Sequence, residues 1–119
     1  MKNIGRCAWL VTLASAFLLG IAGVAFSHPP REIALSLKPG GVLVVDVAHS
    51  VDNPQKHYIF RVTVYVDDKI AEQREYGSQQ NAESMTDNFS LGALPSGAKI
   101  KVEASCVIMG SAASSITVP

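Results

Sequence analysis

The stretch that decides the fold is Lys99-Ile-Lys-Val-Glu-Ala-Ser-Cys106, in which apolar and polar residues alternate without interruption. Successive side chains of a β-strand point to opposite faces, so every second residue from Ile100 to Cys106 lies on one face. Unbroken alternation of this kind indicates a half-buried strand whose apolar face packs against a core. Cys106 is then the last inward-facing residue of this strand.

Six further runs of similar character occur along the chain, and turn-forming residues separate them. They are residues 32–37, 42–49, 58–66, 70–76, 86–91 and 113–118. Pro39-Gly40-Gly41, Asp67-Asp68-Lys69 and Pro95-Ser96-Gly97 are typical of turns, and residues 77–83 form the longest polar loop. No helical period of useful length is present. The sequence therefore predicts an all-β fold, a seven-stranded immunoglobulin-like antiparallel β-sandwich.

The first 27 residues have the pattern of a signal peptide. Lys2 and Arg6 carry the only charges, and the uncharged run that follows ends in small residues that permit cleavage before Phe26 or before His28. About 20 apolar residues also have the length of an uncleaved membrane anchor, but the Thr, Ser, Gly and Ala content of the run favours cleavage. We therefore expect a Sec-type signal peptide at 1–27, export to the periplasm or beyond, and a single domain at 28–119 that is not membrane-bound.

Charge and cysteine content restrict the function further. The chain has ten basic and ten acidic residues, and removal of the leader leaves a slight acidic excess, which does not favour nucleic acid as a partner. Cys7 lies in the leader, so Cys106 has no cysteine partner within the mature chain. Three roles stay open for Cys106: an inert buried thiol, an intermolecular disulfide or a metal ligand.

The three histidines of the chain, His28, His49 and His57, all lie at strand ends or loop edges. His49 has the parity of the apolar residues in the 42–49 run, and His57 directly precedes the next strand. The two imidazoles can therefore converge with Cys106 at one end of a sandwich. Imidazole and thiolate are ligands that suit iron, copper and zinc, so the pattern predicts a metal site.

Three segments of the chain together resemble the iron-binding domain of the superoxide reductase, or desulfoferrodoxin, family. Val-Ala-His-Ser-Val-Asp-Asn-Pro-Gln-Lys-His-Tyr-Ile at 47–59 is similar to the two-histidine segment of that family. His-Pro-Pro at 28–30 is similar to its first histidine motif, His-x-Pro, and Cys-Val-Ile-Met-Gly at 106–110 is similar to its Cys-Asn-x-His-Gly. The resemblance covers nearly the whole mature chain, and its specificity lies in the order and spacing of the motifs.

The resemblance implies one mononuclear ferrous iron at the end of the sandwich, with four histidine nitrogens, an axial cysteine sulfur and an open position for superoxide. Carried over by position, His28, His49, His57 and Cys106 match four of these ligands, and Met109 stands where the family has its fourth histidine. The implied activity is reduction of superoxide, or another small anion, with an electron from an external donor protein. Whether the chain is an enzyme depends on whether that iron site is active.

The chain departs from the family at several positions. A thioether at Met109 is a softer and weaker ligand for ferrous iron than imidazole, and Ser27 stands where the family has a lysine that attracts superoxide. The loop between His49 and His57 is two residues longer than the usual pattern. If cleavage falls before His28, the new α-amine offers a replacement nitrogen ligand, which we state as a hypothesis.

Two other function classes stay open on the same residues. His28 at a new N-terminus, with His49, His57, Cys106 and Met109, forms a ligand set that suits copper, as in a periplasmic copper-binding or copper-delivery module. Alternatively, the domain is a metal-free interaction or sulfur-carrier module in which Cys106 packs in the core or carries a substrate.

Overall fold

The computed structural model describes residues 29–119; the expected signal peptide and His28 lie outside the described residues. Its seven strands are β1 (Glu32–Lys38), β2 (Val42–Ala48), β3 (Ile59–Val66), β4 (Lys69–Glu75), β5 (Ser84–Ser90), β6 (Lys99–Cys106) and β7 (Ser111–Thr117). Within residues 29–119 no helix is long and apolar enough to span a bilayer.

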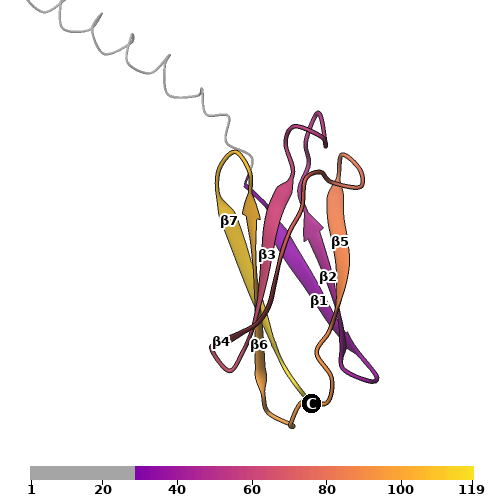
Figure 1. Cartoon of the computed structure of the whole chain (residues 1–119), viewed down its shortest axis with the longest axis vertical. Helices are drawn as coiled ribbons and strands as arrows, with labels where there is room; N and C mark the ends of the chain where they lie inside the picture. The colour runs from indigo at the N-terminus through magenta and orange to yellow at the C-terminus, as the bar shows by residue number, and fades with distance from the viewer. Residues whose placement is uncertain (1–28) are drawn as a thin grey trace, which may run out of the picture.

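The strands form two antiparallel sheets packed face to face, as Figure 1 shows. One sheet has the order β1-β2-β5 and the other β4-β3-β6-β7. The predicted seven-stranded antiparallel sandwich is therefore confirmed, and the observed strand ends fall within two residues of the predicted ones. The largest shifts are two residues, at the starts of β5 and β7. Strand β5 begins at Ser84 because Ser84 and Met85 pair with the end of β2.

Alternating burial along the central strands places the core between the two sheets. In β6 the side chains of Ile100, Val102 and Ala104 are fully buried, and Cys106 is 5% exposed. The inner face of the other sheet contributes Leu43, Val45, Val47, Met85 and Phe89, all with almost no exposure. Burial of these apolar side chains is the main source of free energy holding the sheets together.

The turns explain how the strands reverse within so short a chain. Asp67 and Asp68, between β3 and β4, both have positive φ values, 48° and 68°. Two such residues make the two-residue hairpin turn whose twist matches that of the flanking strands. The predicted tight polar turn at this position is thus confirmed.

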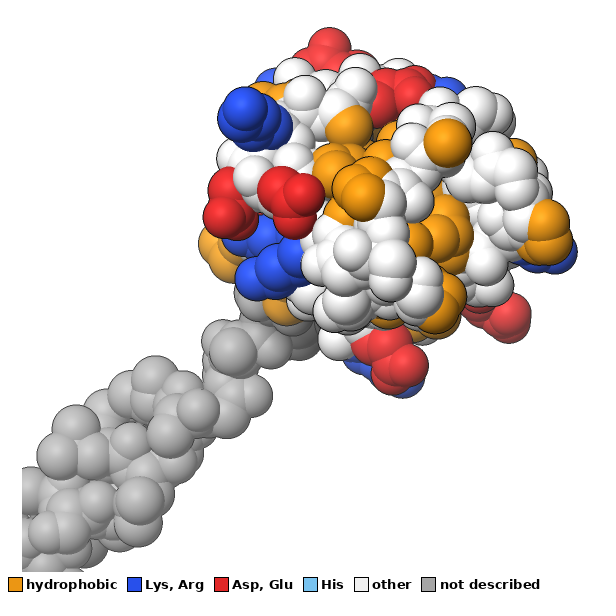
Figure 2. Space-filling model, turned by 90° about the horizontal axis from the view of Figure 1, so that it is seen from below, with side chains coloured by type: hydrophobic (Ala, Val, Ile, Leu, Met, Phe, Trp, Pro, Cys, Tyr) orange, Lys and Arg blue, Asp and Glu red, His pale blue; other side chains and the backbone are white. Residues whose placement is uncertain are grey.

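The two ends of the sandwich differ in character. The end formed by the β1–β2 turn, the β5–β6 connection and the C-terminus carries an apolar depression of about 520 Å³, lined by residues that include Leu37, Leu94 and Val118. Figure 2 views the molecule from this end and shows hydrophobic side chains gathered at its centre. The opposite end carries the loops at 49–58, 77–83 and 107–110. His49, His57 and Cys106 lie at this end.

Candidate metal centre

Three of the five residues suggested as ligands meet at the loop end of the sandwich. One ligand atom each from His49, His57 and Cys106 lies within 4.8 Å of the others. His49 directly follows β2 in the three-stranded sheet, whereas Cys106 ends β6 in the four-stranded sheet. The cluster therefore spans both layers of the sandwich.

Strand geometry accounts for this convergence. His49 continues the inward-facing series of Val45 and Val47, and its side chain is only 1% exposed. Ile59 at the start of β3 pairs with Cys106 at the end of β6, which brings His57, two residues before Ile59, beside the thiol. The period-2 direction of side chains thus aims His49 and Cys106 into the same space between the sheets.

Contacts within the cluster are close. His57 Nε2 lies 3.1 Å from Cys106 Sγ, and the rings of His49 and His57 pack edge to face with centroids 4.9 Å apart. The backbone N–H of Ile108 donates to Cys106 Sγ at 3.4 Å. The thiolate is the form of cysteine that binds metal, and its sulfur would accept this hydrogen bond.

The residues present fit a transition-metal ion in both chemistry and dimensions. Two donor atoms that each bind one ion at about 2.0 to 2.3 Å lie at most roughly 4.4 Å apart. The widest separation in the cluster, within 4.8 Å, is therefore only a small side-chain adjustment from a shared ion. An ion bound by both His57 Nε2 and Cys106 Sγ would replace the hydrogen bond between them, with proton release.

A buried amide, which the sequence analysis missed, holds one of these histidines. Gln79, in the 77–83 loop, is 5% exposed, and its Oε1 lies 2.9 Å from His49 Nδ1. The loop itself is fixed against the histidine segment, because the Gln79 N–H donates to Pro54 O and the Val51 N–H donates to Ala82 O. A polar loop without strand alternation gave no signal that one of its residues would be buried.

A small cavity lies beside the cluster. It measures about 210 Å³ and is lined by Ser50, Val51, Asp52 and His57. Because His57 contributes both to this cavity and to the donor cluster, a small molecule in the cavity would reach the immediate surroundings of a bound ion.

Of the two remaining suggested ligands, the structure describes Met109 but not His28. Met109 lies on the β6–β7 turn with 56% of its surface exposed, so its side chain projects largely into solvent. His28 lies outside the described residues, but the residue after it, Pro29, packs against this turn: a Cβ built on Gly110 would come within 2.5 Å of Pro29 Cβ. The described chain thus begins at the same end of the sandwich as the cluster.

No family model matches the sequence, and no curated protein matches it. Among solved structures, the chain is similar to the superoxide reductase (neelaredoxin) from Archaeoglobus fulgidus in the reduced form, with a TM-score of 0.51 and 18% sequence identity. The match covers 78% of this chain and 90% of that protein. At this identity the comparison establishes a shared sandwich fold.

Proposed function

We propose that this chain is an exported mononuclear non-haem iron-binding protein of superoxide-reductase type. The observation that carries the proposal is the convergence of donor atoms from His49, His57 and Cys106 within 4.8 Å at one end of the sandwich. The fold shared with a superoxide reductase supports it, as does the order of the sequence motifs.

In this proposal each residue of the cluster has a distinct role. His49 and His57 supply neutral imidazole nitrogens, and Cys106 supplies a buried thiolate that donates electron density to the ion. The Ile108 N–H, at 3.4 Å from Sγ, moderates that donation. When bound, iron would supply one-electron chemistry, and reduction of superoxide to hydrogen peroxide takes one electron, from an external donor protein, and two protons.

The remaining positions of the proposed site fall to His28 and Met109. Pro29 packs on Gly110, so the described chain begins at the cluster end of the molecule. We propose His28, through its imidazole or a newly exposed α-amine, as the fourth ligand. Met109, which is mostly exposed, is the weaker candidate for the fifth.

Copper is the second candidate for the same site. Two histidine nitrogens and one cysteine sulfur are the donor set of trigonal copper centres, in which a methionine thioether serves as a weak axial ligand. Within residues 29–119 the clustered donors are this set, His49, His57 and Cys106. Such a protein would bind or deliver copper in the periplasm.

Metal analysis of the protein, purified from its native compartment, tests the proposal. We expect close to one iron per chain and a visible thiolate-to-ferric absorption band after oxidation. Cys106→Ser should abolish the band, because a hydroxyl oxygen does not give sulfur-to-metal charge transfer, and His57→Ala should lower the iron content. Ile70→Ala, which changes an exposed side chain on β4 that is no proposed ligand, serves as the matched control.

Each alternative outcome has a clear meaning. Stoichiometric copper in place of iron would move the assignment to the copper-binding module. Protein that binds neither metal under anaerobic, metal-replete conditions would rule out both. Pulse radiolysis with superoxide tests the reaction itself, and a ferrous protein that superoxide fails to oxidise would leave metal binding without reductase activity.

A further inference from the structure

Gln79 is the one glutamine among residues 29–119 whose side chain is buried, and both polar atoms of its side chain contact His49. Its Nε2 donates to the backbone oxygens of His49 at 2.9 Å and of Asn81 at 3.0 Å. Its Oε1 accepts from the Ile59 N–H at 3.3 Å and faces His49 Nδ1 at 2.9 Å. One amide therefore contacts the end of β2, the start of β3 and its own loop.

The orientation of this amide follows from backbone groups whose hydrogen-bonding polarity is fixed. Carbonyl oxygens only accept and the Ile59 N–H only donates, so the NH₂ of Gln79 must face the two carbonyls and its oxygen must face Ile59. That same oxygen lies against His49 Nδ1. Nδ1 must then carry the proton, because a bare ring nitrogen facing an amide oxygen would repel it, and the lone pair of the neutral ring is on Nε2.

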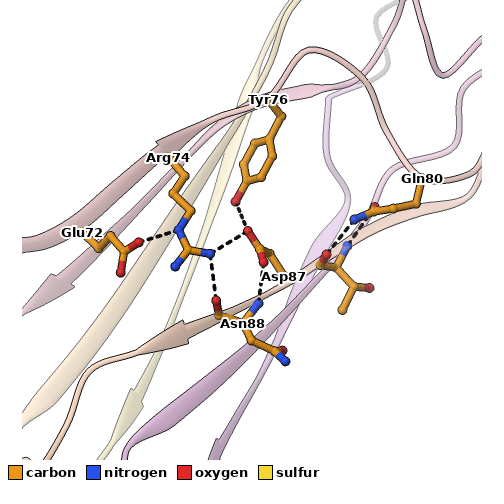
Figure 3. Close-up of polar contacts among 7 residues, drawn as sticks. Glu72, Arg74, Tyr76, Gln80, Asp87 and Asn88 are labelled. Atoms are coloured by element: carbon orange, nitrogen blue, oxygen red, sulfur yellow. Dashed lines mark hydrogen bonds and ion pairs between the residues drawn. The ribbon is translucent and has the colours of Figure 1, made fainter.

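The chain is anchored on both sides of Gln79. The Tyr76 hydroxyl donates to Asp87 Oδ2 at 2.6 Å, and Arg74 donates to the same carboxylate oxygen at 2.9 Å. Gln80 pairs with the backbone of Thr86, donating to its oxygen at 2.8 Å and accepting from its N–H at 3.3 Å. Figure 3 shows the contacts of Tyr76, Arg74 and Gln80. They fix the chain before and after Gln79.

We propose that Gln79 is a positioning residue that fixes the tautomer and ring orientation of His49, and so selects Nε2 as its metal-binding atom. The inference rests on the proposed metal-binding function. Hydrogen bonds from the second nitrogen of a ligating histidine orient the ring and raise its basicity, and their loss typically weakens metal binding 10- to 100-fold. Here a side-chain amide from a different loop supplies that hydrogen bond.

The first experiment needs no metal. Nitrogen-15 NMR of the His49 ring in the metal-free wild-type protein, above the pH at which the ring is protonated, should show the proton on Nδ1. In Gln79→Met, which keeps similar length without hydrogen bonding, a substantial share of the Nε2–H tautomer should appear. Gln73→Met changes an exposed glutamine of β4, outside the Gln79 loop, and should leave the His49 signals as in the wild type. An Nε2–H tautomer in the wild type would overturn the inference, even if the protein binds metal.

The second experiment measures the dissociation constant for Fe²⁺ by chelator competition under anaerobic conditions. We expect Gln79→Met to bind Fe²⁺ about 10- to 100-fold more weakly than wild type, and Gln73→Met to bind as wild type does. Equal affinities in the two variants would overturn the positioning role while leaving the metal site intact. Failure of the wild-type protein to bind Fe²⁺ or Cu⁺ would instead overturn the proposed function, and with it any role of Gln79 toward a metal.

Discussion

At the residue scale, the candidate site depends on side chains whose directions follow from strand parity and on one whose direction does not. His49 and Cys106 each continue a buried alternating series, so their inward direction is a local property of the chain. Gln79 lies in an irregular loop and becomes buried only because the loop folds over the end of β2. Periodicity in the sequence therefore cannot identify Gln79 as the residue that contacts the His49 ring.

The surroundings of Gly41 predict how much stability an alanine at this position would cost. A Cβ at this position would come within 1.8 Å of Gly92 O, and φ is +80°. Gly40 has a similar φ of +87° but no atom within 4 Å of its Cβ position. We expect Gly41→Ala to lower the free energy of unfolding by about 1 to 3 kcal/mol more than Gly40→Ala, because both share the φ strain and only one has the clash. Urea denaturation of both variants measures the difference, and equal losses would contradict it.

At the scale of elements, β4 and β5 are edge strands of different sheets, and a polar cluster joins them. Arg74 of β4 contacts Asp87 and the Asn88 carbonyl of β5, and its guanidinium lies 4.2 Å from the Phe89 ring centroid. Such contacts close the open side of the sandwich, where no backbone hydrogen bonds cross between the layers. They also hold the strands that flank the Gln79 loop.

The same cluster predicts a pH dependence of stability. Burial would raise the pKa of Asp87, but hydrogen bonds from Tyr76 and Arg74 outweigh it and lower that pKa. A lowered folded-state pKa gives stability that is present above the unfolded pKa of about 3.9 and is lost as the pH falls through the folded value. In urea denaturation, the stability gap between wild type and Asp87→Asn should be full at pH 7 and narrow below about pH 4. A gap that is unchanged at acidic pH would contradict this account.

Tyr76 predicts how the stability of the fold changes at alkaline pH. Burial, followed by the hydrogen bond to Asp87, raises the pKa of its phenol. A raised folded-state pKa gives stability that is fully present below the unfolded pKa of about 10 and is lost as the pH rises above it. Tyr76→Phe removes one hydrogen bond to a charged group and should cost about 1.5 to 3 kcal/mol at pH 7, less at higher pH. Denaturant titrations at pH 7 and 10.5 measure this, and an equal cost at both pH values would contradict it.

At the scale of the whole molecule, the donor cluster joins the two sheets, with His49 from one and Cys106 from the other. An ion bound by both would link the layers and bind the folded state alone. Ligand present at 100 times its dissociation constant stabilises a fold by about 2.7 kcal/mol. For a domain of this size that corresponds to a rise in melting temperature of roughly 10 to 20 °C.

Thermal unfolding with and without Fe²⁺, under anaerobic conditions, measures this linkage. We expect the wild type to gain stability with Fe²⁺ and to lose it again with a chelator. His49→Ala removes the donor of the three-stranded sheet and should abolish most of the gain, whereas Ile70→Ala, at an exposed position on β4, should retain it. A gain that persists in His49→Ala would show that the ion binds elsewhere.

The strands and the sandwich could be predicted from the sequence because alternation, turn residues and strand number are local signals. Tertiary packing does not override them in this chain. Asp67 and Asp68 specify their hairpin turn by themselves, and Lys99 to Cys106 specify a half-buried strand. The start of β5 was misplaced because Ser84 pairs with Ala48 across the sheet, and such pairing is not encoded by local hydrophobicity.

What the sequence by itself determined is which side chains face inward: the period of the strand fixes the direction of His49 and Cys106 before any tertiary contact forms. What only the tertiary structure decided is which of them meet, because that depends on the pairing of Ile59 with Cys106 and on the packing of two sheets across the core. The tautomer of His49 was decided in the same way. It is imposed by Gln79, 30 residues away in the chain, and only a packed loop brings that amide within hydrogen-bonding distance of the ring.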